Sequence, residues 1–241
     1  MSEERPHAIT PPEPEPVTNL ADPRAIQILS TEHWSLLATR SLVYNEAFAR
    51  GGMFLSFLSM SFVALALLAQ AMAFGDQFLA VAAILLAFDL VIGLTTYGRI
   101  MGANEDDLRT VHGMARIRHG YTEIAPDVTR YITTPIHDDV DALMMAYGSP
   151  SSSGLGVILY GLTTSGGMIG LITSMVGGVL TGVLGLMFGA AGAAVWIGVG
   201  GAALVFGMLV LLTTGRIART QAAMPALFPS PETSSASEMQ R

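Results

Sequence analysis

The sequence contains no cysteine and no lysine, and only 13% of its 241 residues are charged. A soluble domain carries roughly 25% charged residues, so this content is low and argues against an ordinary soluble enzyme. The absence of cysteine excludes a disulfide scaffold. A hydrophobic content of 51% excludes a disordered chain. Together these features predict a polytopic membrane protein with an all-α fold.

The first pair of predicted membrane helices lies in residues 51–98. Residues 51–74 contain no charged residue, and residues 78–98 contain only one, Asp89. A helix of about 20 apolar residues crosses the roughly 30 Å hydrocarbon core of a bilayer, so each run is long enough to span it. The polar residues between the two runs predict a tight turn.

The second pair lies in a longer stretch, because nothing between Asp141 and Arg216 is charged. Two helices at about 164–188 and 192–214, joined by a turn of small residues, fill this stretch. Three helices would fit by length but would leave almost no residues for turns. We therefore expect four transmembrane helices in all.

The distribution of arginine predicts the orientation. All twelve basic residues are arginines, and neither hairpin turn carries one. They fall in the N-terminal part, in the central segment and after the last span, so the positive-inside rule places these three regions, and both termini, in the cytoplasm. The N-terminus lacks a basic stretch followed by an apolar core, so we expect no cleavable signal peptide. The absence of lysine is typical of a GC-rich bacterial genome, and the expected location is the bacterial inner membrane.

An internal repeat predicts that the two hairpins are duplicated. A shift of about 115 residues aligns residues 51–53 with residues 166–168, both Gly-Gly-Met. The second helices of the two hairpins end alike, as FDLVIGLTTYGRI over 88–100 and FGMLVLLTTGRI over 206–217. Two spans per repeat give both copies the same orientation, with a pseudo-twofold axis along the membrane normal. Chance similarity between apolar runs rich in small residues is the alternative.

These patterns divide the chain into six parts. They are a disordered Pro/Glu-rich tail at 1–29, an amphipathic helix at 30–50, a transmembrane hairpin at 51–98, a cytoplasmic helical insertion at 99–154, a glycine-rich transmembrane hairpin at 155–215 and a disordered cytoplasmic tail at 216–241. The helix at 30–50 places five residues near one face: Trp34, Leu37, Ser41, Asn45 and Phe48. We expect it to lie on, or lead into, the membrane interface, with Trp34 as a headgroup anchor and Arg40 on a solvated face.

Two short helices are expected in the insertion. Asn104 caps the first, whose acidic first turn and i,i+4 pair between Glu105 and Arg109 complement the helix dipole. The second runs from about Asp138 to Tyr147. Two short helices bury little apolar surface alone, so we expect them to dock on the membrane face or on another subunit.

The third membrane helix carries a stripe of small residues at four-residue spacing: Gly166, Gly170, Ser174, Gly178 and Gly182. Such a stripe lets another backbone approach closely, and close packing is what holds helices together in lipid. The first interpretation is packing inside the monomer, against the fourth or the first helix. The alternatives are a face for self-association and the lining of a pore or gate.

Asp89 is the most unusual residue of the spans. It lies ten residues before Arg99, which places it about 15 Å into the bilayer. A carboxyl group at that depth costs a few kcal/mol, so Asp89 should face the bundle interior. Four hydroxyl residues at comparable depth are its candidate partners: Ser59, Ser61, Thr173 and Ser174. The two hypotheses are a polar clasp that fixes helix packing and a proton or cation site on a transport path.

The remaining chemistry-bearing residues give weaker signals. His112, His119, His137 and Asp138 are weak candidates for a metal site, but their spacing matches no metal motif, and no metal or other cofactor is expected. The chain has no phosphate-binding glycine loop, no activated serine and no paired catalytic carboxylates, so we expect no enzymatic activity. A net charge of −7 without a basic stripe argues against nucleic-acid binding.

These observations favour a non-enzymatic assembly or accessory component of the membrane. Its expected partners are the lipid bilayer and either further copies of the chain or other membrane subunits. An oligomeric channel or proton-coupled transporter that uses Asp89 is the first alternative. The second is a membrane effector or sensor, since the order of amphipathic helix, hairpin and cytoplasmic helical piece resembles the two-helix membrane effector domains of bacterial nucleotide-signalling defence systems. The resemblance concerns layout alone, and the second hairpin departs from it.

Overall fold

The computed structural model describes residues 19–148 and 161–231, and every regular element in these two ranges is helical. The elements are α1 (Pro23–Met72), α2 (Asp76–Ile124), the 3-10 helix η1 (Pro126–Tyr131), α3 (Val140–Ala146), α5 (Ser165–Met187) and α6 (Ala194–Ala222). Four of them, α1, α2, α5 and α6, are long and apolar enough to cross a membrane. The chain is therefore an all-helical, multi-pass membrane protein, as its composition predicts.

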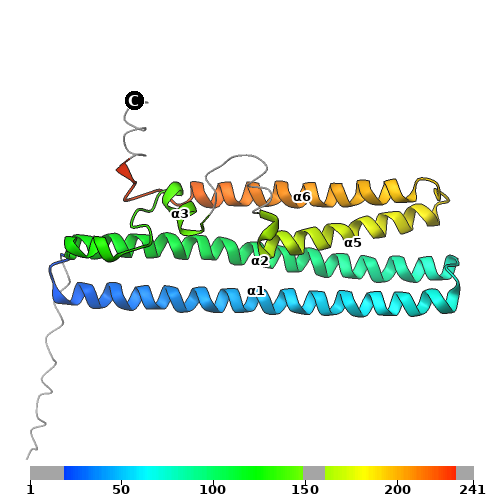
Figure 1. The fold of residues 1–241 in the computed structure, drawn as a ribbon, viewed down its shortest axis with the longest axis horizontal. Helices are drawn as coiled ribbons and strands as arrows, with labels where there is room; N and C mark the ends of the chain where they lie inside the picture. Colours follow the sequence, from blue (N-terminus) through cyan, green and yellow to red (C-terminus); the bar gives the residue numbers. More distant parts are fainter. Residues whose placement is uncertain (1–18, 149–160, 232–241) are drawn as a thin grey trace, which may run out of the picture.

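The four long helices form a row rather than a closed bundle (Figure 1). Each helix packs on the next one in the chain, so α2 and α5 are central while α1 and α6 are the edges. The α1–α2 and α5–α6 turns lie at one end of the row, and the polar halves of α1 and α2, α3 and the segment after α6 lie at the other (Figure 1).

Local sequence explains where these helices begin and turn. The carboxylate of Asp22 caps α1 by accepting the Arg24 N–H, and Pro23 fits the first turn because its missing N–H needs no partner. Between α1 and α2, Ala73 and Phe74 adopt left-handed φ values of 50° and 56°. In the α5–α6 turn, the left-handed position with φ 79° is Gly189, where the lack of a Cβ removes the strain.

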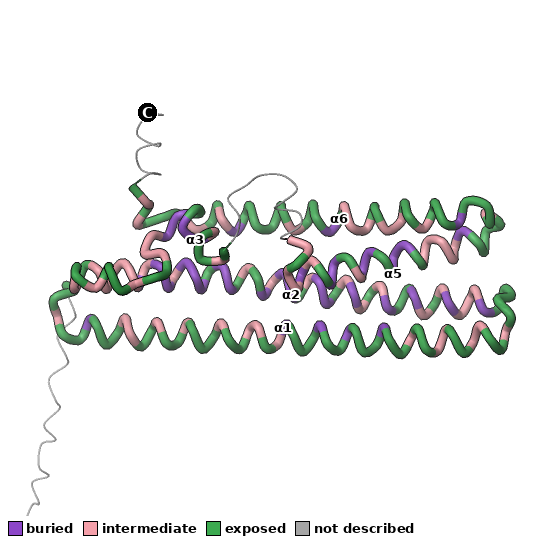
Figure 2. The backbone as a smooth tube through the Cα atoms, viewed as in Figure 1, coloured by how far each residue is buried: buried purple, intermediate pink, exposed green. Residues whose placement is uncertain are grey.

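Burial follows the order of the row (Figure 2). Buried residues run along almost the whole of α2, whereas α1 and α6 are largely exposed. Phe54 of α1 and Leu86 and Ile100 of α2 are the largest apolar side chains that are almost fully buried. In lipid, exposed apolar side chains on the edge helices are expected, because the solvent there is itself apolar.

Two regions can be separated by their chemistry. We call the apolar parts of α1, α2, α5 and α6 (51–72, 76–98, 165–187 and 194–215) the membrane layer. We call residues 23–50 of α1 and 99–124 of α2, together with η1, α3 and residues 216–231, the stalk. At 1.5 Å per residue, the stalk part of α1 extends about 40 Å beyond the membrane layer.

The spans lie close to where the sequence predicts them, and the stalk differs from expectation. The spans expected at 164–188 and 192–214 are α5 and the first part of α6. The helix expected from residue 30 begins at Pro23 and runs into the first span without a break. Asn104 does not cap a separate helix, because α2 continues through it to Ile124. The reason is tertiary: Ile100, Ala103 and Leu108 continue the buried side of α2 past the membrane layer.

The segment after residue 216, expected to be disordered, also belongs to the fold. The helix α6 continues to Ala222, and the chain then packs on α2 and α3 up to Ser230. The sequence carries no periodic signal after Ala222, since the chain there forms no regular element up to residue 230 and is held largely through its main chain. The parts of the two predicted tails at 1–18 and 232–241, and the end of the predicted insertion at 149–154, lie outside the described residues.

Candidate functional site

Asp89 lies inside the membrane layer with 2% of its surface exposed. It is on α2, facing α1, and Ser61 of α1 donates its hydroxyl to the Asp89 Oδ1 at 2.9 Å. Within the described residues the Asp89 Oδ2 is buried without a hydrogen-bond partner. The carboxyl group is therefore clasped at one oxygen only, and this clasp ties α1 to α2.

A second buried polar atom belongs to α5, which packs on α2 one turn after Asp89. Thr173 of α5 is fully buried, and its Oγ1 has no hydrogen-bond partner among the described residues. Its side chain packs on the backbone of Gly93, one turn after Asp89: a Cβ built on Gly93 would lie 2.7 Å from that Oγ1 and 3.1 Å from the ring of Phe54. Helices α1, α2 and α5 therefore meet at Gly93, beside two polar groups of incomplete hydrogen bonding.

The other two hydroxyls expected near Asp89 are directed elsewhere. Ser59 is exposed on α1 and donates to the backbone carbonyl of Leu55. Ser174 is buried, but it donates to the carbonyl of Gly170 within its own helix. The structure therefore brings Ser61 to Asp89, places Thr173 nearby, and leaves Ser59 and Ser174 out of the site.

The small-residue stripe of α5 is covered by the chain's own helices. A Cβ on Gly170 would lie 2.8 Å from the ring of Tyr97 of α2, and one on Gly166 would collide with Met101 of α2. Further along, a Cβ on Gly178 would lie 2.7 Å from the Gly198 carbonyl oxygen of α6, and Gly182 lies against the same helix. The stripe therefore serves close packing on α2 and α6, and it presents no open face to a second copy.

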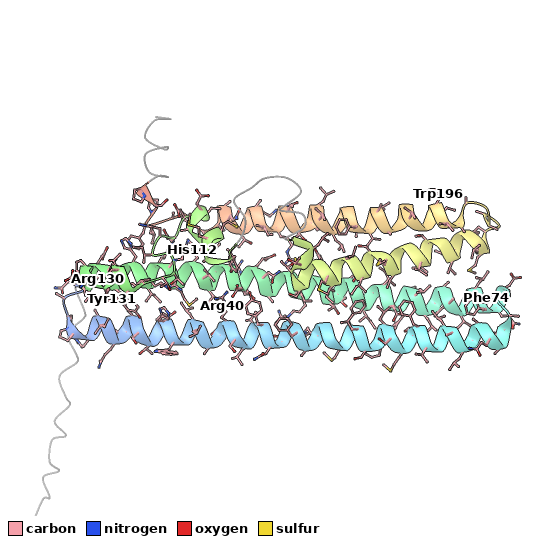
Figure 3. The ribbon with its side chains drawn as sticks, in the orientation of Figure 1. Arg40, Phe74, His112, Arg130, Tyr131 and Trp196 are labelled. Atoms are coloured by element: carbon pink, nitrogen blue, oxygen red, sulfur yellow. The ribbon has the colours of Figure 1, made fainter. Side chains whose placement is uncertain are left out.

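A buried carboxylate organises the stalk. Asp107 of α2 is 2% exposed and accepts hydrogen bonds from the guanidinium of Arg40 (2.6 Å) and from the hydroxyls of Tyr44 (2.9 Å) and Tyr147 (2.6 Å). These partners come from α1 and from the residue that ends α3. Arg40 extends between α1 and α2 (Figure 3). The expectation that it lies on a solvated face is therefore wrong.

The environment of this carboxylate shows in the groups around it. Burial, together with the charge and hydrogen bond of Asp107, raises the pKa of Tyr147 and of Tyr44 above the usual tyrosine value. Burial lowers the pKa of Arg40, but its pairing with Asp107 outweighs this and leaves the pKa raised. Both tyrosines therefore stay protonated as donors, and the arginine stays charged.

Sequence reasoning missed this cluster, although a signal exists. Asp107 falls on the side of α2 that carries Ala103, Val111 and Met114, all of which are buried. A carboxylate on an otherwise apolar helix face needs a buried partner. The charged residue in the apolar stripe was therefore the sign of a tertiary ion pair.

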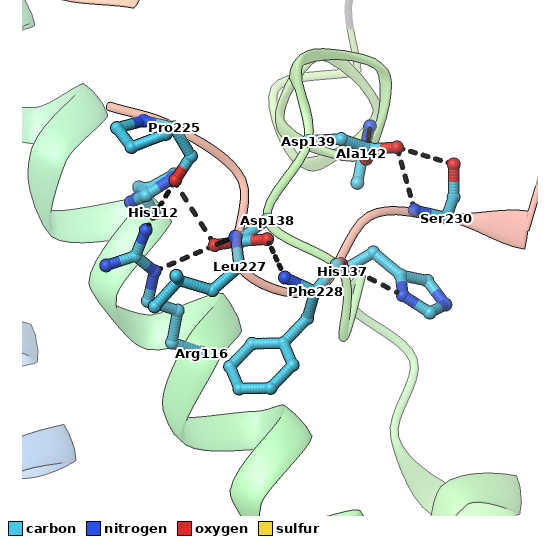
Figure 4. Close-up of polar contacts among 10 residues, drawn as sticks. All are labelled: His112, Arg116, His137, Asp138, Asp139, Ala142, Pro225, Leu227, Phe228 and Ser230. Carbon is cyan, nitrogen blue, oxygen red and sulfur yellow. Dashed lines mark hydrogen bonds and ion pairs between the residues drawn. The ribbon is translucent and has the colours of Figure 1, made fainter. Parts of the chain in front are cut away.

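Three of the four weak candidates for metal binding, His112, His137 and Asp138, lie around residues 225–230, which we call the C-terminal segment (Figure 4). Asp138, with 1% exposed, accepts from Arg116 Nε at 2.7 Å and from the backbone N–H groups of Leu227 (2.9 Å) and Phe228 (2.8 Å). His112 Nε2 lies 3.6 Å from the same carboxylate. Burial raises the pKa of Asp138, but these hydrogen bonds outweigh it and leave the pKa below its usual value.

The other two histidines touch the segment rather than one ion. The ring of His119 stacks on that of Phe228 with centroids 4.0 Å apart, and His137 Nδ1 lies 3.3 Å from the Phe228 carbonyl oxygen. Among the residues that the structure describes, no three His, Asp or Glu side chains are arranged to hold a metal ion. The geometry here is that of main-chain recognition.

One face of α1 is without a partner in the described ranges. Trp34, Leu37 and Phe48 are 68%, 41% and 62% exposed, and Ser41 and Asn45 between them are exposed as well. The side that packs on α2 carries Arg40, Tyr44 and Ala47 instead. An apolar face that extends about 25 Å beyond the membrane layer cannot be covered by lipid tails.

The comparisons with known proteins place no relative beside this chain. It matches no protein-family model, no curated protein and no solved structure.

Proposed function

We propose that this protein is a non-enzymatic assembly component of a membrane, which associates with further copies of itself through the exposed face of α1. The observation that carries the proposal is the solvent-facing stripe of Trp34, Leu37 and Phe48 on the stalk. Large apolar side chains exposed in a row outside the bilayer are typical of an interaction surface.

The same face continues into the membrane layer as a row of small residues. Gly52, Ser56, Ser59 and Ala66 lie on this face at helical spacing and are exposed, and the larger Val63, 61% exposed, interrupts the row between the last two. A Cβ built on Gly52 would meet nothing within 4 Å. Small residues allow close approach of helices in lipid, so the face suits packing both outside and inside the bilayer.

Symmetry favours a second copy as the partner. Two copies inserted in the same sense are related by a twofold axis along the membrane normal, which brings each residue of one α1 opposite the same face of the other. Trp34 then meets its counterpart's face outside the membrane, and Gly52 does so inside. The stripe of α5, which the sequence offers as an alternative association face, is buried against α2 and α6.

The test is the mass of the protein in lipid nanodiscs. The wild-type chain should contain at least two copies per particle, and Trp34→Ser with Phe48→Ser should reduce it to one. Tyr131→Ser is the matched control, because Tyr131 is 72% exposed but lies on η1. A wild-type chain that is monomeric in lipid at all protein concentrations would refute the proposal.

The incompletely bonded pair of Asp89 and Thr173 supports a second candidate, a proton or cation site within the membrane layer. Asp89→Asn distinguishes this candidate from a clasp, since the amide oxygen still accepts from Ser61 but the group no longer ionises. Loss of ion flux in liposomes with unchanged assembly favours the site. Unchanged flux leaves Asp89 as a clasp.

The finer topology belongs to the proposal as well. We place both termini in the cytoplasm of a bacterium, because the arginines of the described residues lie outside the membrane layer or at its edge, on the side of the stalk. We also propose that the two hairpins arose by duplication. In both, the arginine that directly follows the second apolar span pairs with a glutamate of another helix: Arg99 with Glu46 at 2.8 Å and Arg216 with Glu105 at 2.6 Å. Periplasmic activity of a reporter fused after Arg219 would contradict the orientation.

A further inference from the structure

We propose that α2 and the residues that lead into α3 form a peptide-binding site, which residues 225–230 of the same chain fill in this structure and which a segment of a partner protein can fill in their place. The ligand class is a peptide without regular secondary structure that offers main-chain N–H groups and one aromatic side chain. This inference does not depend on the association of α1.

The first argument is that the site recognises main-chain atoms. The carboxylate of Asp138 accepts the N–H groups of Leu227 and Phe228, and that of Asp139 accepts the N–H of Ser230 at 3.0 Å. In return, the N–H of Asp138 donates to the Phe228 carbonyl oxygen at 3.3 Å, and Arg116 donates to the Pro225 carbonyl oxygen at 2.7 Å. Because every peptide carries these groups, such contacts accept many sequences.

The second argument is that the segment completes the hydrogen bonding of the site. Asp138 and Asp139 are 1% and 5% exposed, so their carboxylates are held away from water. Without residues 225–230, Asp138 would lose both of its main-chain donors and keep Arg116. Water would have to replace those donors, whereas a second segment with the same main-chain groups restores them directly.

The third argument concerns specificity and exchange. Only one side chain of the segment has an aromatic partner: the ring of Phe228 lies on His119, while Leu227 is 61% exposed. The apolar anchor beside the segment is Met224, which packs on the cluster of Leu108, Val111, Met114 and Leu143. Residues 225–230 themselves bury little apolar surface, so they can separate while Met224 stays in that cluster. A tethered ligand acts at an effective concentration of about 1 mM, so a partner segment competes when its own binding overcomes that advantage.

The experiment uses the full chain in lipid nanodiscs and a fluorescent peptide of residues 224–231 with blocked ends. Phe228→Ala removes the aromatic anchor of the chain's own segment, and Ser230→Pro removes the N–H and hydroxyl that Asp139 accepts. Both variants leave the carboxylates and Arg116 in place. We expect each to bind the peptide at least tenfold more tightly than the wild-type chain does, by fluorescence anisotropy.

Two controls define the site. Leu227→Ala keeps the main-chain donor and removes only an exposed side chain, so it should bind the peptide as the wild-type chain does. The same peptide with alanine in place of phenylalanine should bind the Phe228→Ala chain at least tenfold more weakly, and Asp138→Asn in that chain should have a similar effect. Equally weak peptide binding by the wild-type chain and by the Phe228→Ala and Ser230→Pro variants would overturn the proposal. Binding that does not depend on the peptide's phenylalanine would overturn it as well.

Discussion

The stalk and the membrane layer are built on the same two helices, yet different forces hold them. In the stalk, α1 and α2 are joined through the buried Asp107 and its ring of donors. In the membrane layer, small residues let the helices touch, as at Gly93 against Thr173 and at Gly178 against α6. In water, burial of apolar surface stabilises a contact between helices, whereas in lipid it does not. Close approach of the helices therefore contributes more to stability inside the bilayer.

The difference predicts which substitution damages which region. Removal of the buried carboxylate in the stalk should weaken the stalk and spare the membrane layer. A larger side chain on the packed face of α5 should do the reverse. The predictions below test this division, beginning with the largest effect.

Asp107→Ala should destabilise the stalk by about 3 kcal/mol, because it leaves Arg40 and two tyrosine hydroxyls without their shared acceptor. Hydrogen exchange of stalk amides in nanodiscs measures the loss. Asp106→Ala is the control: its carboxylate is 52% exposed and pairs only with an exposed arginine on the next turn. Equal losses in the two variants would mean that the cluster does not organise the stalk.

Gly178→Val should destabilise the packing of α5 on α6 by about 2 kcal/mol, the usual cost of overpacking. A Cβ at this position would lie 2.7 Å from both the Ala202 Cβ and the Gly198 carbonyl oxygen. The free energy of unfolding in mixed micelles measures the effect. Gly200→Val is the matched control, since a Cβ there would meet nothing within 4 Å. If both variants unfold alike, close approach does not hold this pair of helices.

Acidification should weaken the stalk before the membrane layer, with a smaller effect because no packing is removed. Burial lowers the pKa of His112 and of His33, with nearby arginines adding to the shift. The unfolded chain then binds these protons more tightly than the folded stalk, so stability is full above pH 6.5 and falls as the pH drops below that value.

A second loss of stability should follow below pH 3.8, where the lowered pKa of Asp138 has the same sign. Thermal unfolding of the stalk at pH 8, 5 and 3 measures both steps. His112→Gln should reduce the loss between pH 8 and 5. An unchanged difference in that variant would show that another group is responsible.

Arg109→Ala should change stability least, by about 0.3 kcal/mol, because its pair with Asp106 is more than half exposed on both sides. The same hydrogen-exchange measurement applies. A loss approaching that of Asp107→Ala would contradict the view that exposed ion pairs contribute little to the stability of the stalk.

The sequence predicted the parts of the fold that depend on composition and period. Uncharged runs of sufficient length placed the four spans, since a charge in lipid is costly wherever the neighbours lie. The burial of Asp89 against other helices could be predicted for the same reason. Which hydroxyl reaches Asp89 was not, because Ser59 and Ser61 point to different sides of α1.

Polar pairing in the stalk was decided by neighbours far along the chain. Local spacing pairs Glu105 with Arg109, but Glu105 binds Arg216 of α6 at 2.6 Å. The sequence places Asp138 at the start of a short helix, but its carboxylate accepts the main-chain N–H groups of Leu227 and Phe228.

The sequence by itself determined that the chain has four segments long and apolar enough to cross a bilayer, because transfer of apolar and charged groups into lipid is a property of each residue. Only the tertiary structure decided that α1 and α2 continue as one stalk, and that the chain after α6 packs on it. Those outcomes depend on hydrogen bonds between buried carboxylates and donors far away in the sequence, and a local sequence pattern does not predict such pairs.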